Sequence, residues 1–376
     1  MKTRRFLNVA IGQYYDGGSL GRVINPNKHL FYPSTADARR HQIQRAAAAK
    51  AKVKANQGKA KQRKSTSEAS SSDEDCNGTS APPEDYDVLR VVTPKFRFKA
   101  SSHPGGGTGM LDFFPFYGGT AGGEERILCM DSNGMAALYN TDATTIQMMP
   151  RLQEPKRWEP ISFFLTHAAD PGALYVMDGA GSRSRPSSTA TPTHRGPPCF
   201  NTTISVSLRD SGSSSNSRGT AVPAGGTYCF DTGTSEWTKA GRWRLPFSSS
   251  ALHVPELDNN LLFGIDGNNS NRFCAVDVLG AMRTNGSAPV LQHEWEDVNP
   301  LPNWSLQHHS VAYLGDRRFC IHRSFEVMEM DGWGSDYEAV DTVVLLTGVE
   351  VVREGSKLRM VKHKSKRLDH DSYIVF

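Results

Sequence analysis

Long apolar runs are missing from this sequence. No stretch approaches the roughly 18 apolar residues that a membrane-spanning helix needs, and the apolar stretch near the start, residues 6–11, is short and contains Asn8. A secretory signal requires a longer uninterrupted apolar core. We therefore expect no membrane partner and a location in the cytoplasm or nucleus.

Metal-ligand spacings are missing as well. Neither Cys-x-x-Cys nor His-Glu-x-x-His occurs, although zinc sites need ligands at such short spacings. The cysteines instead stand far apart, and most lie in apolar runs, which is typical of reduced, buried thiols. They are Cys76, Cys129, Cys199, Cys229, Cys274 and Cys320. We expect no metal, no cofactor and no disulfide framework.

An excess of one charge is missing too. The 376 residues include 43 Lys and Arg against 39 Asp and Glu, which gives a formal net charge of +4. Proteins whose main work is to bind phosphate backbones carry a larger basic surplus. The balance therefore argues against a dedicated nucleic-acid-binding protein.

One short motif matches a sequence pattern found in hydrolases. Residues 17–21 match the Gly-x-Ser-x-Gly pattern of a nucleophile elbow, which requires a strand before it and a helix after it. Residues 22–26 predict a strand and then a turn, so we interpret the glycines as a hairpin turn. The glycine-rich stretch 105–109 lacks the Lys of a phosphate loop and is interpreted as a flexible turn.

Short strands separated by Gly, Asp and Asn turns fill most of the chain. Residues 126–150 predict three strands joined by two tight turns, and the same pattern returns at 261–278 and 310–321. Amphipathic helical periodicity is scarce outside residues 36–55. The predicted fold class is all-β.

A unit made of a strand, a turn and a Trp-bearing strand recurs about every 45 to 65 residues. Repeats of this length in an all-β chain are typical of propeller blades, because radial stacking covers both faces of each sheet. We predict a β-propeller of about six blades, with five to seven left open, closed by pairing of the first strand with carboxy-terminal strands. The repeat residues are Gly225, Gly226, Tyr228, Asp231, Trp237 and Trp295.

The best copy of the unit, from Gly225 to Trp237, resembles the kelch motif, in which paired glycines end a strand and aromatic side chains pack between blades. Landmark segments are similar to those of a grass-expanded plant family of uncharacterised kelch-like proteins, of the domain of unknown function 1668 type. These segments are Arg4–Val9, Leu30–Thr35, Thr227–Asp231, Val254–Leu257, Leu346–Glu350 and Met360–Arg367. The resemblance implies a kelch-like propeller from a plant, and no established activity.

Residues 36–87 depart from the strand pattern. Residues 36–64 contain ten basic residues and one acid around four consecutive alanines, which predicts a helix without an apolar stripe. Residues 65–87 contain seven acids and no Lys or Arg, a composition typical of disorder. We interpret 36–87 as a charged insertion between two strands of the first blade, and 1–35 and 88–376 as the propeller.

Two candidate signals lie in this insertion. A candidate nuclear-import patch consists of Lys59, Lys61, Arg63 and Lys64. Serines followed by acids are candidate phosphorylation sites for an acid-directed kinase, namely Ser70, Ser71 and Ser72. The alternative for both is a solvated segment whose charges neutralise each other.

Lysines alternate along a predicted carboxy-terminal strand at 359–368. Strand geometry places Val361, His363 and Ser365 on one face. The opposite face then carries Lys362, Lys364 and Lys366. Such lysines either guard an outer strand against edge-to-edge pairing or bind an acidic partner.

No set of catalytic residues converges in these patterns. We therefore expect a non-enzymatic, monomeric β-propeller that binds a protein partner through its loops and the charged insertion. One alternative is a carbohydrate-active or oxidative propeller enzyme with its site at the central axis, which requires acids or metal ligands from several blades. Another is a nuclear protein that associates with nucleic acid through residues 39–64.

Overall fold

The structure is a computed structural model. It describes residues 4, 6–13, 17–64, 86–92, 96–101, 111–116, 126–141, 143–151, 161–167, 170–177, 203–208, 226–231, 236–243, 245–247, 251–254, 256–258, 260–267, 272–283, 287–330, 336–370 and 372–375.

The described strands form six sheets, four of which contain four or five strands. The first sheet has the order β22 (Ser372–Val375), β1 (Phe6–Gln13), β2 (Gly17–Ile24), β4 (Arg97–Phe98). The second has the order β5 (Leu111–Phe116), β6 (Arg126–Asp131), β7 (Ala136–Asn140), β8 (Thr145–Met149). These last three strands occur where the local pattern predicts them.

Two smaller sheets come next along the chain. They are β10 (Asp170–Met177) with β9 (Ile161–His167), and β11 (Thr203–Leu208), β12 (Gly226–Asp231), β13 (Glu236–Gly241). The next sheet has the order β14 (Leu252–His253), β15 (Leu261–Ile265), β16 (Phe273–Asp277), β17 (Leu291–Trp295). The largest has the order β18 (Trp304–Gly315), β19 (Arg318–Met330), β20 (Tyr337–Glu354), β21 (Lys357–Leu368), β3 (Val88–Leu89).

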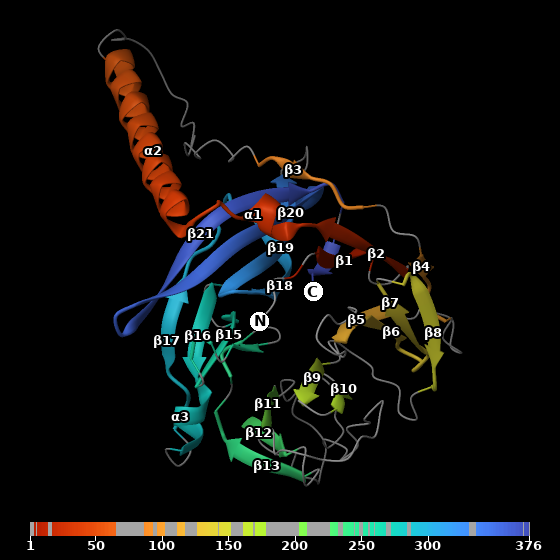
Figure 1. Cartoon of the computed structure of the whole chain (residues 1–376). Helices are drawn as coiled ribbons and strands as arrows, with labels where there is room; N and C mark the ends of the chain where they lie inside the picture. The colour runs from red at the N-terminus through yellow and green to blue at the C-terminus, as the bar shows by residue number, and fades with distance from the viewer. Residues whose placement is uncertain are drawn as a thin grey trace.

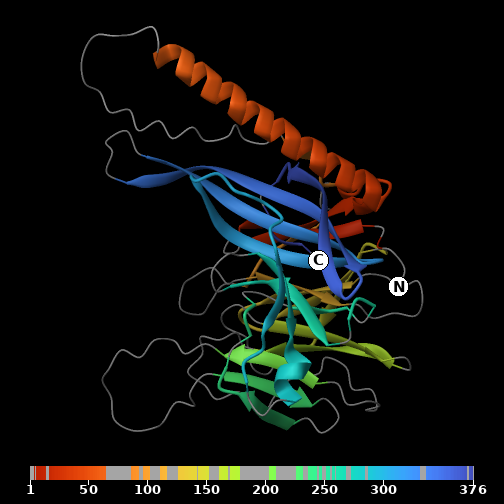
Figure 2. The ribbon, with the colours of Figure 1, turned by 90° about the vertical axis from the view of Figure 1, so that its left-hand side faces the viewer.

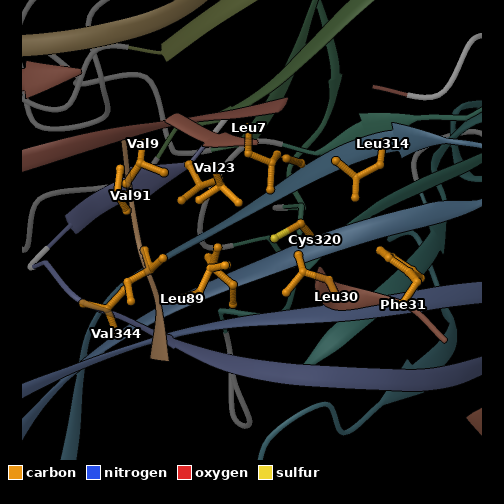
Figure 3. Packing of buried hydrophobic residues seen from close by; sticks show 14 residues of the cluster. Leu7, Val9, Val23, Leu30, Phe31, Leu89, Val91, Leu314, Cys320 and Val344 are labelled. Carbon is orange, nitrogen blue, oxygen red and sulfur yellow. The ribbon is translucent and has the colours of Figure 1, made fainter. Parts of the chain in front are cut away.

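The sheets follow one another around a common centre, as in a β-propeller (Figure 1). Apolar clusters join neighbouring sheets: the rings of Phe273 and Phe319 lie 5.2 Å apart across one such junction, and Leu7 and Leu314 belong to a second cluster (Figure 3). Burial of one such side chain contributes about 1.5–3 kcal/mol. The predicted all-β fold and its propeller-like arrangement are confirmed, while the blade number and kelch type stay predictions.

The two ends of the chain meet in one sheet. Strand β22 pairs antiparallel with β1, with Val375 opposite Val9 and Ile374 opposite Ala10. The buried Ser310 hydroxyl in β18 accepts a hydrogen bond from the backbone N–H of Val375 at 3.0 Å, which ties β22 to the neighbouring sheet. The predicted pairing of the first strand with a carboxy-terminal strand is therefore confirmed.

In the described part of the chain, three helices accompany the sheets: α1 (Pro26–Leu30), α2 (Thr35–Lys64) and α3 (Val278–Arg283). Helix α2 begins with a reciprocal cap, because Ser34 Oγ accepts from the Asp37 N–H and donates to the Asp37 carboxylate. It extends well beyond the sheets (Figure 2), as a helix without an apolar face does. The basic half of residues 36–87 is thus helical, and residues 65–85 lie outside the described part of the chain.

Strand β2, which comes before α2 in the chain, pairs with β4, which follows it. A segment that leaves and re-enters one sheet leaves the order of its strands unchanged. Between these two strands the chain also adds β3 to the edge of the neighbouring sheet.

Two glycine interpretations are corrected by the structure. Residues 17–21 form part of strand β2 and are not a hairpin turn; at Gly21 a Cβ would lie 2.4 Å from Val91, so close packing explains this glycine. The kelch resemblance implies paired glycines at the end of a strand, but Gly226 begins β12. Gly225 lies outside the described residues.

Candidate functional site

A pocket of about 200 Å³ lies where the first turns of α2 approach β21. Its walls come from three segments: the α1–α2 connection, the exposed side of α2, and the outer part of β21. The lining residues are Tyr32, His41, Gln42, Arg45, Lys362 and His363. Figure 1 shows the base of α2 beside β21.

Helix α1 positions this pocket. Asn25, in the left-handed region at φ 49°, turns the chain into α1, and Pro26 at the first helical position suits the fixed φ of proline. The helix packs directly on β20 at Gly348, where a Cβ would lie 2.4 Å from the Leu30 carbonyl oxygen. Because Gly348 has no side chain, α1 can approach closely and place Tyr32 over β21.

A buried polar group forms the floor of the pocket. The backbone N–H of Tyr32 donates to Nδ1 of His363 at 3.1 Å, and the other ring nitrogen, Nε2, lies 3.2 Å from Glu350 Oε2. Since Nδ1 accepts a hydrogen bond, the ring is neutral here and its proton is on Nε2, from which it donates to Glu350. Both ring nitrogens of His363 are thereby engaged.

Glu350 anchors α2 to this floor. Its Oε2 also accepts a hydrogen bond from Thr35 Oγ1, the first residue of α2, at 2.9 Å. Burial tends to raise the pKa of this carboxyl, but hydrogen bonds from His363 and Thr35 and the positive charge of Arg318 outweigh it and hold the pKa below its ordinary value. The carboxylate is therefore a fixed negative charge under a cationic rim.

Aromatic and cationic groups form the walls. The rings of Tyr32 and His41 stack with centroids 4.3 Å apart and planes inclined by 10°. The ammonium of Lys364 lies 4.9 Å from the centre of the Tyr32 ring, a cation–π distance. Gln42 Nε2 donates to the Lys362 carbonyl at 3.0 Å, so α2 satisfies a backbone acceptor of β21.

Positive charge is concentrated around this pocket. Burial lowers the pKa of Lys364, and the neighbouring Lys366 lowers it further, although Asp87 acts in the opposite direction. Burial likewise lowers the pKa of His29, together with the charges of Lys28, Lys366 and Lys364. Burial is the main cause of both shifts, and the cationic neighbours that both bases share show that several positive charges lie close together here.

An exposed carboxylate already binds at the rim. Asp87 forms an ion pair with Lys366, its side chain is 79% exposed, and its carbonyl accepts a hydrogen bond from the Arg367 N–H. The Lys366 hydrogen bond, followed by the Lys366 charge, lowers the pKa of the Asp87 carboxyl.

The predicted alternation of β21 is correct. Val361, His363 and Ser365 are buried, and the three lysines between and after them are half-buried. Strand β21 is not the outermost strand, however, because β3 pairs in parallel with its last two residues. Further along β21, the Lys362 carbonyl accepts a hydrogen bond from Gln42 of α2.

One further predicted residue, Trp295, lies outside the pocket. Trp295 packs against the cluster around Phe273, with ring centroids 5.6 Å apart. The side chains of the import patch, at the far end of α2, lie outside the described part, and so do those of three repeat residues: Tyr228, Asp231 and Trp237. The candidate phosphorylation sites Ser70, Ser71 and Ser72 are outside it as well.

Sequence reasoning missed most of the pocket. Tyr32 and His41 come from segments with no strand repeat, and Arg45 is one of many basic residues of α2. The alternation at 361–365 does mark His363 as buried, and an ionisable side chain at a buried strand position is the one local signal of the polar floor.

In the described part of the chain, no group of three or more His, Cys, Asp or Glu side chains is placed to hold a metal ion. Of the described helices, none has the length and apolar character needed to cross a bilayer.

Comparison with known proteins agrees with the resemblance seen in the landmark segments. No curated protein matches the sequence. A family described as "Protein of unknown function (DUF1668)" matches residues 4–220 and 200–368. Since these matches together cover nearly the whole chain, the protein belongs to this family of unknown function.

Proposed function

We propose that this protein is a non-catalytic binding protein whose α2–β21 pocket recognises an acidic segment of a partner protein. The observation that carries the proposal is that Arg45 and Lys362, from elements far apart in the chain, line one pocket. Lys364 and Lys366 extend the cationic surface along β21. Such a surface attracts carboxylates through charge-assisted hydrogen bonds.

The engagement of His363 supports a binding role. A general base needs a ring nitrogen that can take a substrate proton. Here Nδ1 accepts from Tyr32 and Nε2 faces Glu350. The histidine therefore acts as a structural link between the α1–α2 connection and β20.

The scaffold we propose is a kelch-like propeller with six blades, monomeric and located in the cytoplasm or nucleus. The six separate sheets formed by the described strands support this blade number. Propellers commonly bind partners at the connections that project from their faces, and the α1–α2 connection is of this kind.

The test is a peptide-binding assay in which fluorescence anisotropy measures the affinity. A fluorescein-labelled peptide of alternating Glu and Ser should bind the full chain, and binding should weaken as salt concentration rises. Arg45→Gln and Lys362→Gln should each reduce the affinity about fivefold. Lys50→Gln, which makes the same charge change on α2 outside the pocket, is the control. Equal losses in all three variants, or no binding by the wild type, would refute the proposal.

The exposed basic helix favours a second candidate, nucleic-acid association through α2. The helix extends away from the sheets (Figure 2) and carries ten basic residues. This function predicts strongly salt-dependent duplex binding that Lys50→Gln weakens as much as Arg45→Gln does. A difference between these two variants therefore separates the candidates.

A further inference from the structure

We propose that the α2–β21 pocket selects a phosphate monoester on the acidic segment, so that the protein binds a phosphoserine-containing peptide. This inference rests on the proposed function and deepens it, because it names the group that enters the pocket.

The size of the pocket favours a small group. Its volume of about 200 Å³ is below the roughly 300–1,000 Å³ typical of sites for drug-sized ligands. The pocket is also open, since His41, Gln42 and Arg45 on α2 are exposed. A single charged group on a longer chain can therefore enter while the rest of the peptide stays outside.

The cations favour an ion with more than one charge. Arg45 and Lys362 line the pocket from opposite elements, and His41 adds a third nitrogen-bearing side chain. A phosphate monoester carries about −1.5 to −2 charges at neutral pH and three acceptor oxygens. A carboxylate carries one charge and two oxygens, so it engages fewer of these donors at once.

The rings argue against recognition of a planar ligand. Tyr32 and His41 already stack on each other at 4.3 Å, and the Lys364 ammonium lies over the Tyr32 ring at 4.9 Å. These contacts hold the aromatic side chains as walls. Selectivity therefore falls to the guanidinium and ammonium groups, which recognise tetrahedral oxyanions well.

The rim shows how a peptide would continue. The chain's own Asp87 carboxylate pairs with Lys366, two strand positions from Lys364 on the same face of β21. An acidic residue near the phosphoserine can use this cationic row in the same manner. The preferred ligand is thus a phosphoserine flanked by acids.

The experiment compares three peptides that differ at one central residue: serine, glutamate or phosphoserine, each flanked by Glu. Isothermal titration calorimetry on the full chain should show phosphoserine binding about tenfold more tightly than glutamate. Arg45→Lys keeps the charge but loses the two-pronged guanidinium. It should reduce phosphoserine affinity at least fivefold and glutamate affinity by a smaller factor, while Lys50→Gln changes neither.

The outcomes separate the two proposals. If the glutamate peptide binds at the pocket and phosphoserine binds no more tightly, phosphate selectivity is wrong and acidic-peptide recognition stands. If no peptide binds, both are wrong. Inorganic phosphate is also titrated as a competitor of the phosphopeptide. Displacement of the phosphopeptide by phosphate beyond that caused by chloride at the same ionic strength supports the pocket as the phosphate site. Equal displacement by phosphate and chloride overturns it.

Discussion

His363 Nδ1 accepts a hydrogen bond from the backbone N–H of Tyr32 at 3.1 Å, although 331 positions separate the two residues in the chain. The bond joins the α1–α2 connection to β21 and fixes which nitrogen of His363 carries the proton. Nε2 of the same ring donates to Glu350, and Glu350 in turn accepts a hydrogen bond from Thr35 at the start of α2. The base of α2 is therefore held by one continuous polar chain.

Glu350 should make part of the stability depend on acid pH. Its pKa in the folded protein lies below the ordinary value of 4.5, so its contribution is fully present above pH 4.5 and is lost as the pH falls through the folded-state pKa. Glu350→Gln keeps both hydrogen-bond acceptor contacts but cannot ionise. Urea unfolding at pH 7, 5, 4 and 3 should show a shallower acid loss in this variant, and parallel curves for both proteins would contradict the assignment.

Gly348 should tolerate no side chain. A Cβ at this position would lie 2.4 Å from the Leu30 carbonyl oxygen and 3.0 Å from Leu30 Cβ, so Gly348→Ala should cost about 1–3 kcal/mol and displace α1. Gly355→Asn is the matched control, because Gly355 has φ +62° with open space around it and Asn accepts this region. Thermal unfolding measures the stability of both variants. Similar losses of stability in the two would show that α1 shifts to accommodate the added methyl group.

The buried ion pair of Arg323 and Asp297 should be costly to break. The two side chains are 6% and 1% exposed, and their closest atoms are 2.6 Å apart. Asp297→Asn removes the carboxylate charge that pairs with a buried guanidinium, which costs about 3–5 kcal/mol. The control is Asp258→Asn in the exposed pair with Arg353, with an expected loss below about 1 kcal/mol. Chemical denaturation distinguishes them; equal losses would mean that water reaches Arg323.

Closure of the ring by β22 should be a major source of stability. Deletion of residues 372–376 removes the pairing with β1 and the buried Val375, a loss of about 3–6 kcal/mol from one apolar side chain and several backbone hydrogen bonds. Ser310→Ala removes the hydroxyl that binds the Val375 backbone and also lies 3.3 Å from His322 Nδ1, at about 1–2 kcal/mol. If the deletion leaves the unfolding midpoint unchanged, the ring is closed by other contacts.

Three buried cysteines should resist alkylation in the native state. Cys129, Cys274 and Cys320 are free thiols, and burial, reinforced by nearby acids, raises the pKa of Cys274 to about 12. Burial also raises the pKa of the other two thiols. Because the thiolate is the reactive form, peptide mapping after iodoacetamide treatment should find these three unmodified until urea is added. Labelling of the native chain at Cys320 would show that the sheet opens.

Much of the strand structure could be predicted because its determinants are local. The residues 126–150 form three strands as expected, since alternation and Asp, Asn or Gly turns act over a few positions. The alanine and lysine content of residues 36–64 likewise predicts the helix that the structure shows there. Gly17–Gly21 was misread, because the contact of Gly21 with Val91 depends on packing of a distant segment.

The candidate pocket depended on relations that no local pattern contains. Alternation along 359–368 correctly set lysines against a buried His363, because side chains of a strand point to opposite faces in turn. Which groups faced those lysines was decided by packing of α1 on Gly348, a contact between positions more than 300 residues apart. Residue order thus specifies faces and turns, whereas the choice of neighbours comes from the shape of the closed ring, since packing alone brings distant side chains within bonding distance.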